Sequence, residues 1–316
     1  MTPPFSALTV FGGISWDTVV IVSQFLGPDE KAWAKVVGRF PGGMGANVAA
    51  AYAALGGRVS LVSAVGRDAA GRSSLATLRQ LGVDTSSVTE GEGSTFETLA
   101  MIDGSGEKAM LLLEPPDLVA PGDRKIAGLR AGSDALHVAP SRFAPDFADI
   151  ARCHEAGIHT SFDIEPSMLE RGLDFRAYLR VASVIFCGET ASTIMAGAGS
   201  PRQRAQRLVE LGAGLAVITR GHEGAVVAGR GETFLERPGM AINPLNTTGA
   251  GDVFAGTFLF GLSSGWSTAQ CLAAANFAGA RCARSYASQD PGFDRRSLLA
   301  LPEFSPSQSR RNTDEG

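Results

Sequence analysis

The sequence predicts an α/β protein with a mostly parallel central sheet, helices on both faces of that sheet, and a second, smaller sheet. Short apolar runs alternate with helix-compatible segments through most of the 316 residues, which is typical of βαβ units. Two β-rich segments, at about 16–40 and 95–113, do not follow the alternation. We therefore expect one domain over residues 1–304, with these two segments forming a lid.

The amino-terminal half supplies the first strands and helices of this pattern. Residues 8–11 and 59–65 are short apolar runs closed by glycine and are expected to be strands. Residues 46–55 are rich in alanine and end at a Gly-Gly pair, which predicts a tightly packed helix. A second helix is expected over 73–81, where Gly82 follows.

The lid segments contain β-like runs of their own. Residues 18–22 form one such run, and two more flank Asp103-Gly104-Ser105-Gly106, which is a hairpin signal. Active sites of parallel sheets lie beyond the carboxyl ends of the strands, so a lid placed there could close over a site and exclude water. A small isolated sheet has exposed edges, and a second copy of the chain could cover them as a homodimer.

The carboxyl-terminal half continues the alternation. Residues 253–262 are too apolar for a surface helix and suit a buried one. Residues 305–316 have no apolar pattern and are expected to be disordered. Four further strands are expected at 136–138, 159–163, 183–186 and 215–219.

The composition narrows the classes of function that the protein can have. Apolar residues make up 44% and charged residues 19% of the chain, as in ordinary globular enzymes. The net charge of −4 and the lack of a basic block argue against nucleic acid as a partner. The four cysteines and four histidines show no zinc-site spacing. The sequence shows neither a signal peptide nor a membrane span, so we expect a cytoplasmic protein.

The most informative motif is Asn246-Thr247-Thr248-Gly249-Ala250-Gly251-Asp252, which directly precedes the buried helix. The first N–H groups of a helix have no intrahelical partner, and the helix dipole makes that end positive. A phosphate, or the charge on a phosphoryl group in transfer, fits there. Asp252 falls in the first turn, where its carboxylate could take a proton from an attacking hydroxyl.

A glycine-rich turn before a helix does not by itself define a phosphate site. Many such turns serve only as tight connections. A Walker phosphate loop requires a lysine, and Gly256 stands at its position. A dinucleotide fingerprint follows a strand directly, whereas residues 244–246 indicate a turn.

A second glycine-rich helix start occurs at Pro41-Gly42-Gly43-Met44-Gly45-Ala46-Asn47-Val48-Ala49. Close packing alone could explain its glycines. However, Asn47 is a polar residue among alanines, and its amide can both donate to and accept from hydroxyls. Asp17, after the first strand, could accept hydrogen bonds from two adjacent hydroxyls, as sugar recognition requires.

In their order and separation, the two motifs resemble the ribokinase-like (PfkB-type) family of carbohydrate and nucleoside kinases. The resemblance extends from Gly12 to about residue 287 and implies a three-layer α/β/α fold with a β-sheet lid. It also implies that Gly249, Ala250 and Gly251 form an anion hole and that Asp252 is the catalytic base. By the same likeness the substrate hydroxyls would be held by Asp17, Gly42, Gly43 and Asn47.

The resemblance further implies a nucleotide site that takes ATP with Mg²⁺. The run from Thr219 to Gly224 looks like the family's T-x-G-x-x-G loop, in which Thr219, Gly221 and Gly224 match. Asn276 matches a position that approaches the adenine.

The sequence departs from the family pattern at two places. Asn246 replaces the usual Asp, which removes a charge that helps to organise cations and argues against a monovalent cation there. Where the family has N-x-x-E, this chain has Gly188 and Ala191, and Glu189 is the only acid nearby to bind a metal. Both differences predict altered cation handling.

The leading hypothesis is an ATP-dependent kinase that phosphorylates a primary hydroxyl of a sugar or nucleoside, with Asp252 as the base. A non-catalytic sugar- or nucleotide-binding protein with the same fold is the alternative, and the replaced N-x-x-E motif motivates it. A dinucleotide-dependent oxidoreductase is a third, weaker alternative, because no strand leads directly into the glycines.

Overall fold

A nine-stranded sheet forms the centre of the molecule in the computed structural model, which describes residues 4–104, 108–113, 115, 134–141, 144–231, 234–290 and 292–305. The strand order is β13-β12-β11-β10-β9-β8-β1-β4-β5. All neighbours are parallel except β11 with β12 and β12 with β13, which are antiparallel. The strands span Ala7–Phe11 (β1), Arg58–Gly66 (β4), Val88–Gly91 (β5), Asp134–Val138 (β8), His159–Ile164 (β9), Val184–Gly188 (β10), Leu215–Thr219 (β11), Ala225–Gly229 (β12) and Phe234–Arg237 (β13).

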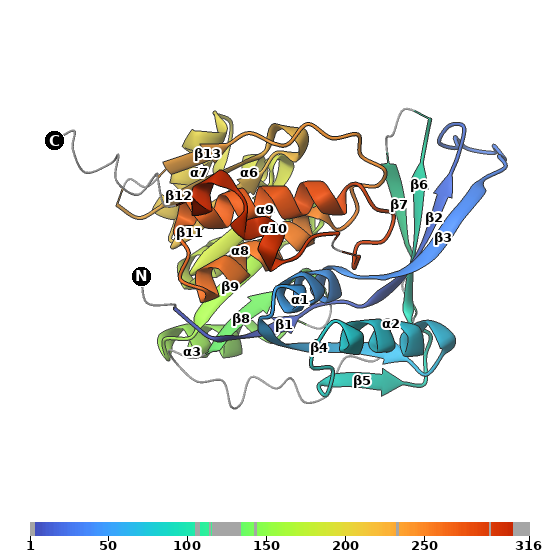
Figure 1. The fold of residues 1–316 in the computed structure, drawn as a ribbon, viewed down its shortest axis with the longest axis horizontal. Coiled ribbons are helices and arrows are strands. Elements are labelled where there is room, and N and C mark those ends of the chain that lie inside the picture. Colours follow the sequence, from blue (N-terminus) through green and yellow to red (C-terminus); the bar gives the residue numbers. More distant parts are fainter. Residues whose placement is uncertain are drawn as a thin grey trace.

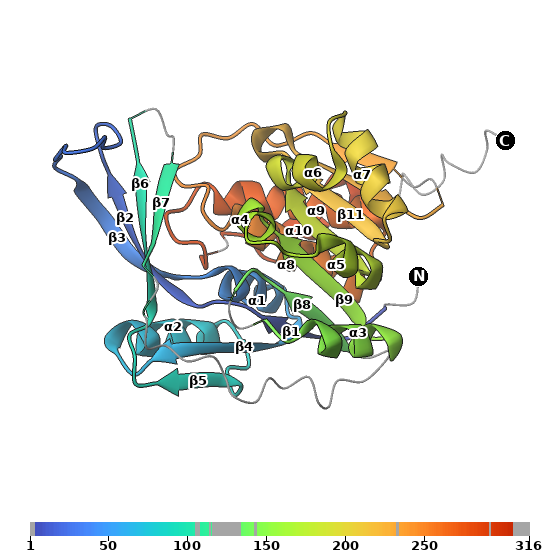
Figure 2. The same ribbon diagram turned by 180° about the vertical axis from the view of Figure 1, so that it is seen from behind.

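Helices cover both faces of this sheet. Helices α1, α8 and α9 lie on the face seen in Figure 1, and α3, α5, α6 and α7 lie on the face seen in Figure 2. The longer helices span Met44–Ala54 (α1), Ala69–Gln80 (α2), Phe147–Glu155 (α3), Glu189–Ala196 (α6), Pro201–Glu210 (α7), Ala250–Ser263 (α8) and Thr268–Cys282 (α9). The shorter ones span Pro166–Glu170 (α4), Phe175–Val181 (α5) and Arg295–Leu299 (α10), with 3₁₀ turns at Gly221–Glu223 and Pro302–Phe304.

The two faces of the sheet bury two separate hydrophobic clusters. Leu8 and Val10 on β1 point into the cluster under α1 and α8, whereas Phe11 points into the cluster under α3 and α5. Val217 and Ile218 on β11 divide in the same way. Because successive side chains of a strand point to opposite faces, strands that are covered on both sides become continuous apolar runs.

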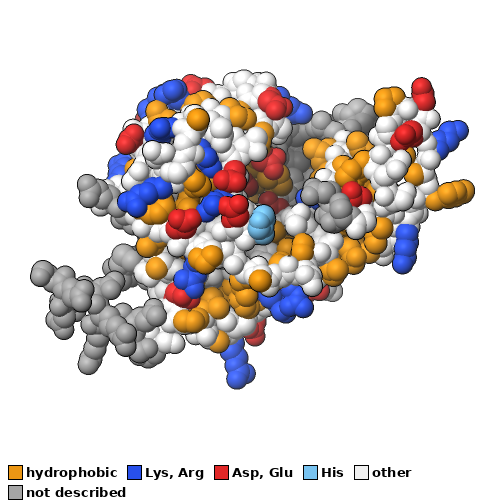
Figure 3. All heavy atoms as spheres, turned by 90° about the horizontal axis from the view of Figure 1, so that it is seen from above, with side chains coloured by type: hydrophobic (Ala, Val, Ile, Leu, Met, Phe, Trp, Pro, Cys, Tyr) orange, Lys and Arg blue, Asp and Glu red, His pale blue; other side chains and the backbone are white. Residues whose placement is uncertain are grey.

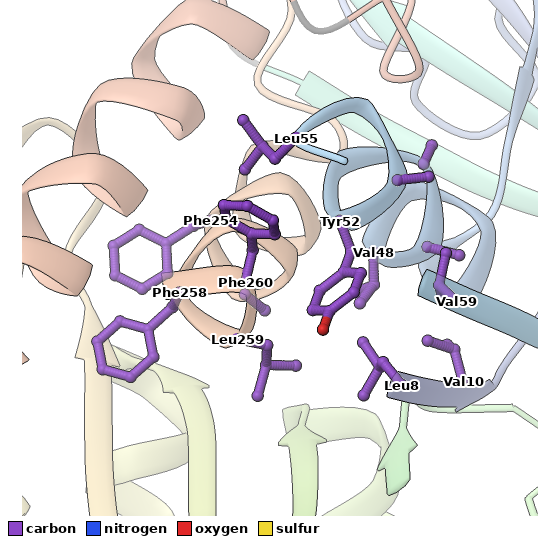
Figure 4. Packing of buried hydrophobic residues seen from close by; sticks show 14 of the residues in the cluster. Leu8, Val10, Val48, Tyr52, Leu55, Val59, Phe254, Phe258, Leu259 and Phe260 are labelled. Carbon is purple, nitrogen blue, oxygen red and sulfur yellow. The ribbon is translucent and has the colours of Figure 1, made fainter. Parts of the chain in front are cut away.

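Helices α1 and α8 pack against each other so closely that the contact needs small residues. A Cβ added to Gly256 would lie 2.5 Å from the Val48 carbonyl oxygen and 3.0 Å from the Ala51 Cβ. Figure 4 shows Tyr52 of α1 near Phe260 of α8, and the centroids of these two rings are 5.7 Å apart. This contact joins the two glycine-rich helix starts of the sequence in space.

A second sheet of four strands, in the order β3-β2-β6-β7, projects from one end of the large sheet (Figure 1). Its strands span Ser15–Ile21 (β2), Lys35–Gly42 (β3), Phe96–Ile102 (β6) and Lys108–Leu113 (β7). We call this sheet the lid. Its strands come from the two β-rich segments that the sequence set apart, and the predicted fold class is confirmed.

The predicted elements differ from the structure mainly at their ends. The helix expected over 73–81 begins four residues earlier, at Ala69, because the Asp68 carboxylate accepts a hydrogen bond from the Gly71 N–H at 2.7 Å and caps it. Part of the predicted lid turn, at 105–107, and residues 306–316 of the predicted tail lie outside the described residues. None of the helices described is both long and apolar enough to cross a bilayer.

Candidate active site

The amino end of α8 lies near the carboxyl end of β9, since Asp252 in its first turn interacts electrostatically with Asp163 and Glu165 there. Among the described residues no side chain caps this helix, and its N-cap residue, Gly249, has a φ of 77°. A Cβ at Gly249 would lie 2.6 Å from the Ser288 Cβ and 3.0 Å from the Asn47 amide nitrogen, so the position requires glycine for both space and conformation. At Gly251 an added Cβ would meet no atom of the described residues within 4 Å. The first turn thus presents its N–H groups on a side where a ligand has room.

Asp252 is buried in this first turn, with 7% of its surface exposed. Its Oδ2 accepts a hydrogen bond from the Asn47 Nδ2 at 2.8 Å, which joins α8 to α1. Burial raises the pKa of Asp252 to about 7, the charges of Glu165 and Asp17 add to the rise, and the Asn47 hydrogen bond and Lys108 oppose it. A carboxylate with this pKa can accept a proton near neutral pH.

Asp17 lies on the lid strand β2, next to the start of α1. Its Oδ1 accepts hydrogen bonds from the Ser15 Oγ at 2.6 Å and the Thr98 Oγ1 at 2.8 Å. A Cβ on Gly42 would lie 1.9 Å from the Asp17 Oδ2, so the glycine leaves room for this carboxylate. Burial raises the pKa of Asp17, and the bonds from Ser15 and Thr98 and the charge of Lys108 oppose that rise.

Gly43 and Asn47 complete this side of the site. Gly43 is the N-cap of α1, with a φ of 99°. Asn47 is buried one turn further on, and the structure shows its amide bonded to Asp252. The four residues predicted to hold substrate hydroxyls therefore lie together and beside the predicted base. Their role toward a substrate stays a prediction.

Gln289 is a site residue that the sequence patterns did not reveal. Its Nε2 donates to the Gly42 carbonyl oxygen and to the Asn47 Oδ1, both at 3.3 Å. It follows α9 in a segment without a motif, so no signal in the sequence pointed to it.

Lys108 was also not predicted. It is exposed at the start of lid strand β7, and its Nζ donates to the Thr248 Oγ1 at 3.2 Å. Its charge opposes the rise in pKa that burial causes in Asp17, Glu165 and Asp252. The signal that could have pointed to it was a lysine at the beginning of an otherwise apolar strand.

Two further acids stand at the carboxyl end of β9. Burial raises the pKa of Asp163 well above its usual range, and the charges of Asp252 and Glu165 add to that rise. Burial also raises the pKa of Glu165. The site therefore concentrates carboxyl groups, and Figure 3 shows Asp and Glu side chains on the large-sheet side of the hollow between that sheet and the lid.

The predicted nucleotide loop follows β11. The Thr219 Oγ1 donates to the Cys187 carbonyl oxygen at 3.4 Å, and Gly221 and Gly224 have φ values of 55° and 96°. A Cβ at Gly224 would lie 2.1 Å from the Arg237 carbonyl oxygen, and the Asn276 Nδ2 donates to that same oxygen at 3.4 Å. The structure thus brings this loop and Asn276 to the same carbonyl oxygen, that of Arg237.

Glu189, the metal candidate, is engaged in ion pairs. Its Oε1 accepts from the Arg204 Nη2 at 2.9 Å and lies 3.8 Å from the Arg220 Nε. Among the described residues, no three His, Cys, Asp or Glu side chains are grouped closely enough to hold a metal.

Asn246 closes the loop before α8. Its Oδ1 accepts from the Thr248 N–H at 3.0 Å, an Asx turn, and its Nδ2 donates to the Tyr286 carbonyl oxygen at 3.3 Å. Both the oxygen and the nitrogen of the neutral amide are therefore hydrogen-bonded. This arrangement organises the loop without the charge of an aspartate.

Comparison with known proteins gives the family. The family model described as pfkB family carbohydrate kinase matches residues 7–294. The chain belongs to this family. The resemblance inferred from the two glycine-rich motifs is confirmed. The matched residues include all described strands of the large sheet and the lid.

The relatives include several kinases. The chain is 32% identical over 243 residues to a fructokinase of Escherichia coli, covering 71% of this chain and 77% of that one. It is 27% identical over 272 residues to a cytidine kinase of Thermococcus kodakarensis, covering 84% and 91%. It is similar in fold to the ribokinase of Thermotoga maritima, with a TM-score of 0.77 at 21% identity over 94% of this chain and 99% of that one. These relatives do not favour the non-catalytic alternative.

Proposed function

We propose that the protein is an ATP-dependent phosphotransferase that phosphorylates a primary hydroxyl of a sugar or nucleoside. One observation carries the proposal: the buried carboxylate of Asp252, with its pKa raised to about 7, lies in the uncapped first turn of α8. A base and an anion-binding helix end at one place are what transfer of a phosphoryl group to a hydroxyl requires. Relatives named fructokinase and cytidine kinase support both substrate classes.

The acceptor would lie between the lid and α1. Among the described residues, Ser15 and Thr98 both donate to the Asp17 Oδ1, which leaves its Oδ2 to accept from a substrate hydroxyl. The backbone of Gly42 and Gly43 and the amide of Asn47 line the same place. A hydroxyl held there would face Asp252, which removes its proton as the oxygen attacks phosphorus.

The phosphoryl group would meet two sources of positive potential. The N–H groups of Gly249, Ala250 and Gly251 face it from the helix end, and Lys108 faces it from the lid. Since Lys108 reaches Thr248 across the hollow, closing the lid would bring its ammonium to the transferring group.

ATP would lie along the Thr219–Gly224 loop, with its adenine near Asn276. The ribokinase of Arabidopsis thaliana, solved with ribose and ATP, has a TM-score of 0.76 to this chain at 24% identity over 96% of this chain and 100% of that one, which supports the placement at the level of the fold. Gly221 and Gly224 have positive φ values and no Cβ, so the backbone at these two positions can approach a ligand closely.

The carboxyl groups suit a Mg²⁺ ion that travels with the nucleotide. Mg²⁺ in kinases is held by one or two carboxylates, phosphate oxygens and water. Asp163 and Glu165 are oxygen donors whose pKa values are raised mainly by burial, and the charges of Asp252 and Glu165 add to the rise for Asp163, so a cation there would favour the ionised carboxylates. Mg²⁺ would neutralise phosphate charge there. We favour these two residues over Glu189, which Arg204 already engages, and we propose no monovalent cation beside the neutral Asn246.

Replacement of the base tests the proposal. Asp252→Asn keeps the shape of the side chain and its contact with Asn47 but cannot accept the proton, so we expect turnover to fall by roughly 10²-fold or more with little change in KM. The measurement is ATP consumption over a panel of sugars and nucleosides. Turnover in Asp252→Asn close to that of the wild type would show that Asp252 is not the base.

Binding without product would reveal the non-catalytic alternative. Compounds that raise the melting temperature identify ligands of the folded protein whether or not they react. A sugar or nucleoside that stabilises the protein together with ATP, yet gives no phosphorylated product, would contradict the proposed function.

A further inference from the structure

Gln289 is a buried side chain that no motif explains, with 5% of its surface exposed. It contacts the first glycine-rich helix start directly, by donating to the Asn47 Oδ1. It is linked to the second one through Asn47, which donates to the Asp252 Oδ2. Its Oε1 is buried and has no hydrogen-bond partner in the described part of the chain. A buried amide with an unpaired oxygen is costly, so the contacts of its nitrogen must offset that cost.

The chain of contacts has a fixed direction. It begins at the Gly42 carbonyl oxygen, which can only accept, so Gln289 must turn its NH₂ group toward it. The same NH₂ group then lies 3.3 Å from the Asn47 Oδ1. With its oxygen receiving that bond, Asn47 must turn its own NH₂ group toward the Asp252 carboxylate, 2.8 Å away.

The opposite orientation of the Asn47 amide would disfavour the ionised form of Asp252. A reversed amide would place its Oδ1 against the Asp252 Oδ2, two acceptors without a proton between them when Asp252 is ionised. A donor held toward the carboxylate favours the ionised form, and an acceptor favours the protonated one. Only the ionised form can accept a proton from a hydroxyl.

We propose that Gln289 is a positioning residue that holds the Asn47 amide with its NH₂ group toward the Asp252 carboxylate. The proposal rests on the proposed function, in which Asp252 is the base. Gln289 itself touches no reacting atom. Its orientation is fixed by the Gly42 carbonyl oxygen, and through Asn47 it favours the ionised form of Asp252.

The charges around Asp252 come from several elements and do not include Gln289. Asp17 on β2, Lys108 on β7, Asp163 and Glu165 at the end of β9, and Cys282 on α9 interact electrostatically with Asp252. A neutral replacement of Gln289 leaves all of these charges in place. Any change in the titration of Asp252 would then come from the hydrogen bonds.

The first experiment measures kcat/KM against pH for wild type and Gln289→Met. Methionine keeps the length of the side chain but donates no hydrogen bond, so Asn47 is free to turn. We expect the midpoint of the acidic limb to rise by about 0.5–1 pH unit, while turnover well above that midpoint stays within about threefold of wild type. Gln80→Met, at the exposed end of α2, is the matched control and should keep the wild-type midpoint.

The second experiment asks whether the effect passes through Asn47. In an Asn47→Ala background the Gln289→Met change should leave the midpoint unmoved, because no amide remains to be positioned. An equal shift in both backgrounds, or a uniform loss of activity at all pH values with no shift, would overturn the proposal.

The proposal is tested even if no acceptor is phosphorylated, an outcome that would count only against the proposed function. The midpoint then comes from the pH dependence of the stability difference between each chain and its Asp252→Asn counterpart, and the same shift is expected. If Gln289→Met does not fold, NMR of the wild type decides: the side-chain NH₂ signals of Asn47 and Gln289 should both titrate with the midpoint of Asp252. Independent titration of the Gln289 signal would overturn the proposal.

Discussion

Asp252 shows how one residue takes its chemistry from its surroundings. An aspartate in water titrates at about 3.9, whereas burial in the first turn of α8 raises the pKa of Asp252 to about 7. The Asn47 amide keeps the ionised form accessible by donating to it at 2.8 Å. Burial, this hydrogen bond and the charges of Glu165, Asp17 and Lys108 together set the pH at which Asp252 can act as a base.

The raised pKa of Asp252 predicts a pH dependence with a definite sign. A group whose pKa is higher in the folded state contributes stability that is fully present below its unfolded pKa and is lost as the pH rises through about 7. Asp252→Asn lacks this loss, so we expect it to be more stable than wild type at pH 8 by roughly 2–4 kcal/mol, since one pKa unit corresponds to about 1.4 kcal/mol. The advantage should shrink toward pH 4. Denaturant unfolding across this range is the measurement, and a difference independent of pH would contradict it.

Lys108 predicts a contribution of the lid to the chemical step. Lys108→Met removes the positive charge beside Thr248 and keeps much of the apolar stem, so we expect kcat to fall by roughly 10–100-fold with a smaller change in KM. Lys35→Met, on the opposite edge strand of the lid, is the matched control. Equal activities for the two variants would remove Lys108 from the mechanism.

At the scale of elements, the contact between α1 and α8 positions the site. The alanine-rich sequence of α1 and the glycines of α8 let the two backbones approach, and the amino end of each helix carries one of the glycine-rich motifs. Tyr52 of α1 packs edge-on against Phe260 of α8 in the same contact (Figure 4). Small residues at this contact therefore serve the site as well as the core.

Gly256 provides a test of this contact. Gly256→Ala would place a Cβ 2.5 Å from the Val48 carbonyl oxygen, and such overpacking costs about 1–3 kcal/mol of unfolding free energy. We expect it to separate the helices slightly and to lengthen the contact between Asn47 and Asp252. Gly188→Ala, where an added Cβ meets no atom within 4 Å, is the control. Urea unfolding of both variants checks the prediction, which fails if the two lose equal stability.

At the scale of the whole molecule, the lid leaves apolar surface uncovered. Its edge strands are β3 and β7, and the apolar side chains exposed on or beside them are Trp33, Val36, Leu111, Leu112 and Leu113. Figure 3 shows hydrophobic side chains spread over this part of the molecule. Open strand edges with apolar side chains favour pairing with another chain.

We therefore propose that two copies associate through their lids. Charge on the β7 edge should prevent this, so Leu111→Lys with Leu113→Lys is expected to lower the sedimentation coefficient to that of a monomer. Ile194→Lys changes a similarly exposed apolar residue on α6, outside the lid, and should leave the association unchanged. A monomeric wild type, or equal behaviour of the two variants, would contradict a lid dimer.

Much of the fold could be predicted because its signals are local. The apolar runs at 8–11, 59–65 and 215–219 became β1, β4 and β11, since burial on both faces of a parallel sheet requires continuous apolar strands. Strand β12 was not predicted although its residues form a buried apolar run, whereas β13, which was also not predicted, is only partly buried and ends in Glu236 and Arg237. The start of α2 was misplaced because Asp68 caps it with a side chain that also bonds to Thr95.

The sequence by itself determined the class of the protein, the two glycine-rich helix starts and Asp252, because each depends on residues that are neighbours in the chain. Only the tertiary structure decided how these parts act on one another. Asn47 and Asp252 are 205 positions apart, Lys108 comes from the lid, and Gln289 follows the last long helix. Their contacts depend on how α1, α8 and the lid pack, and packing is a property of the whole chain that no local pattern records.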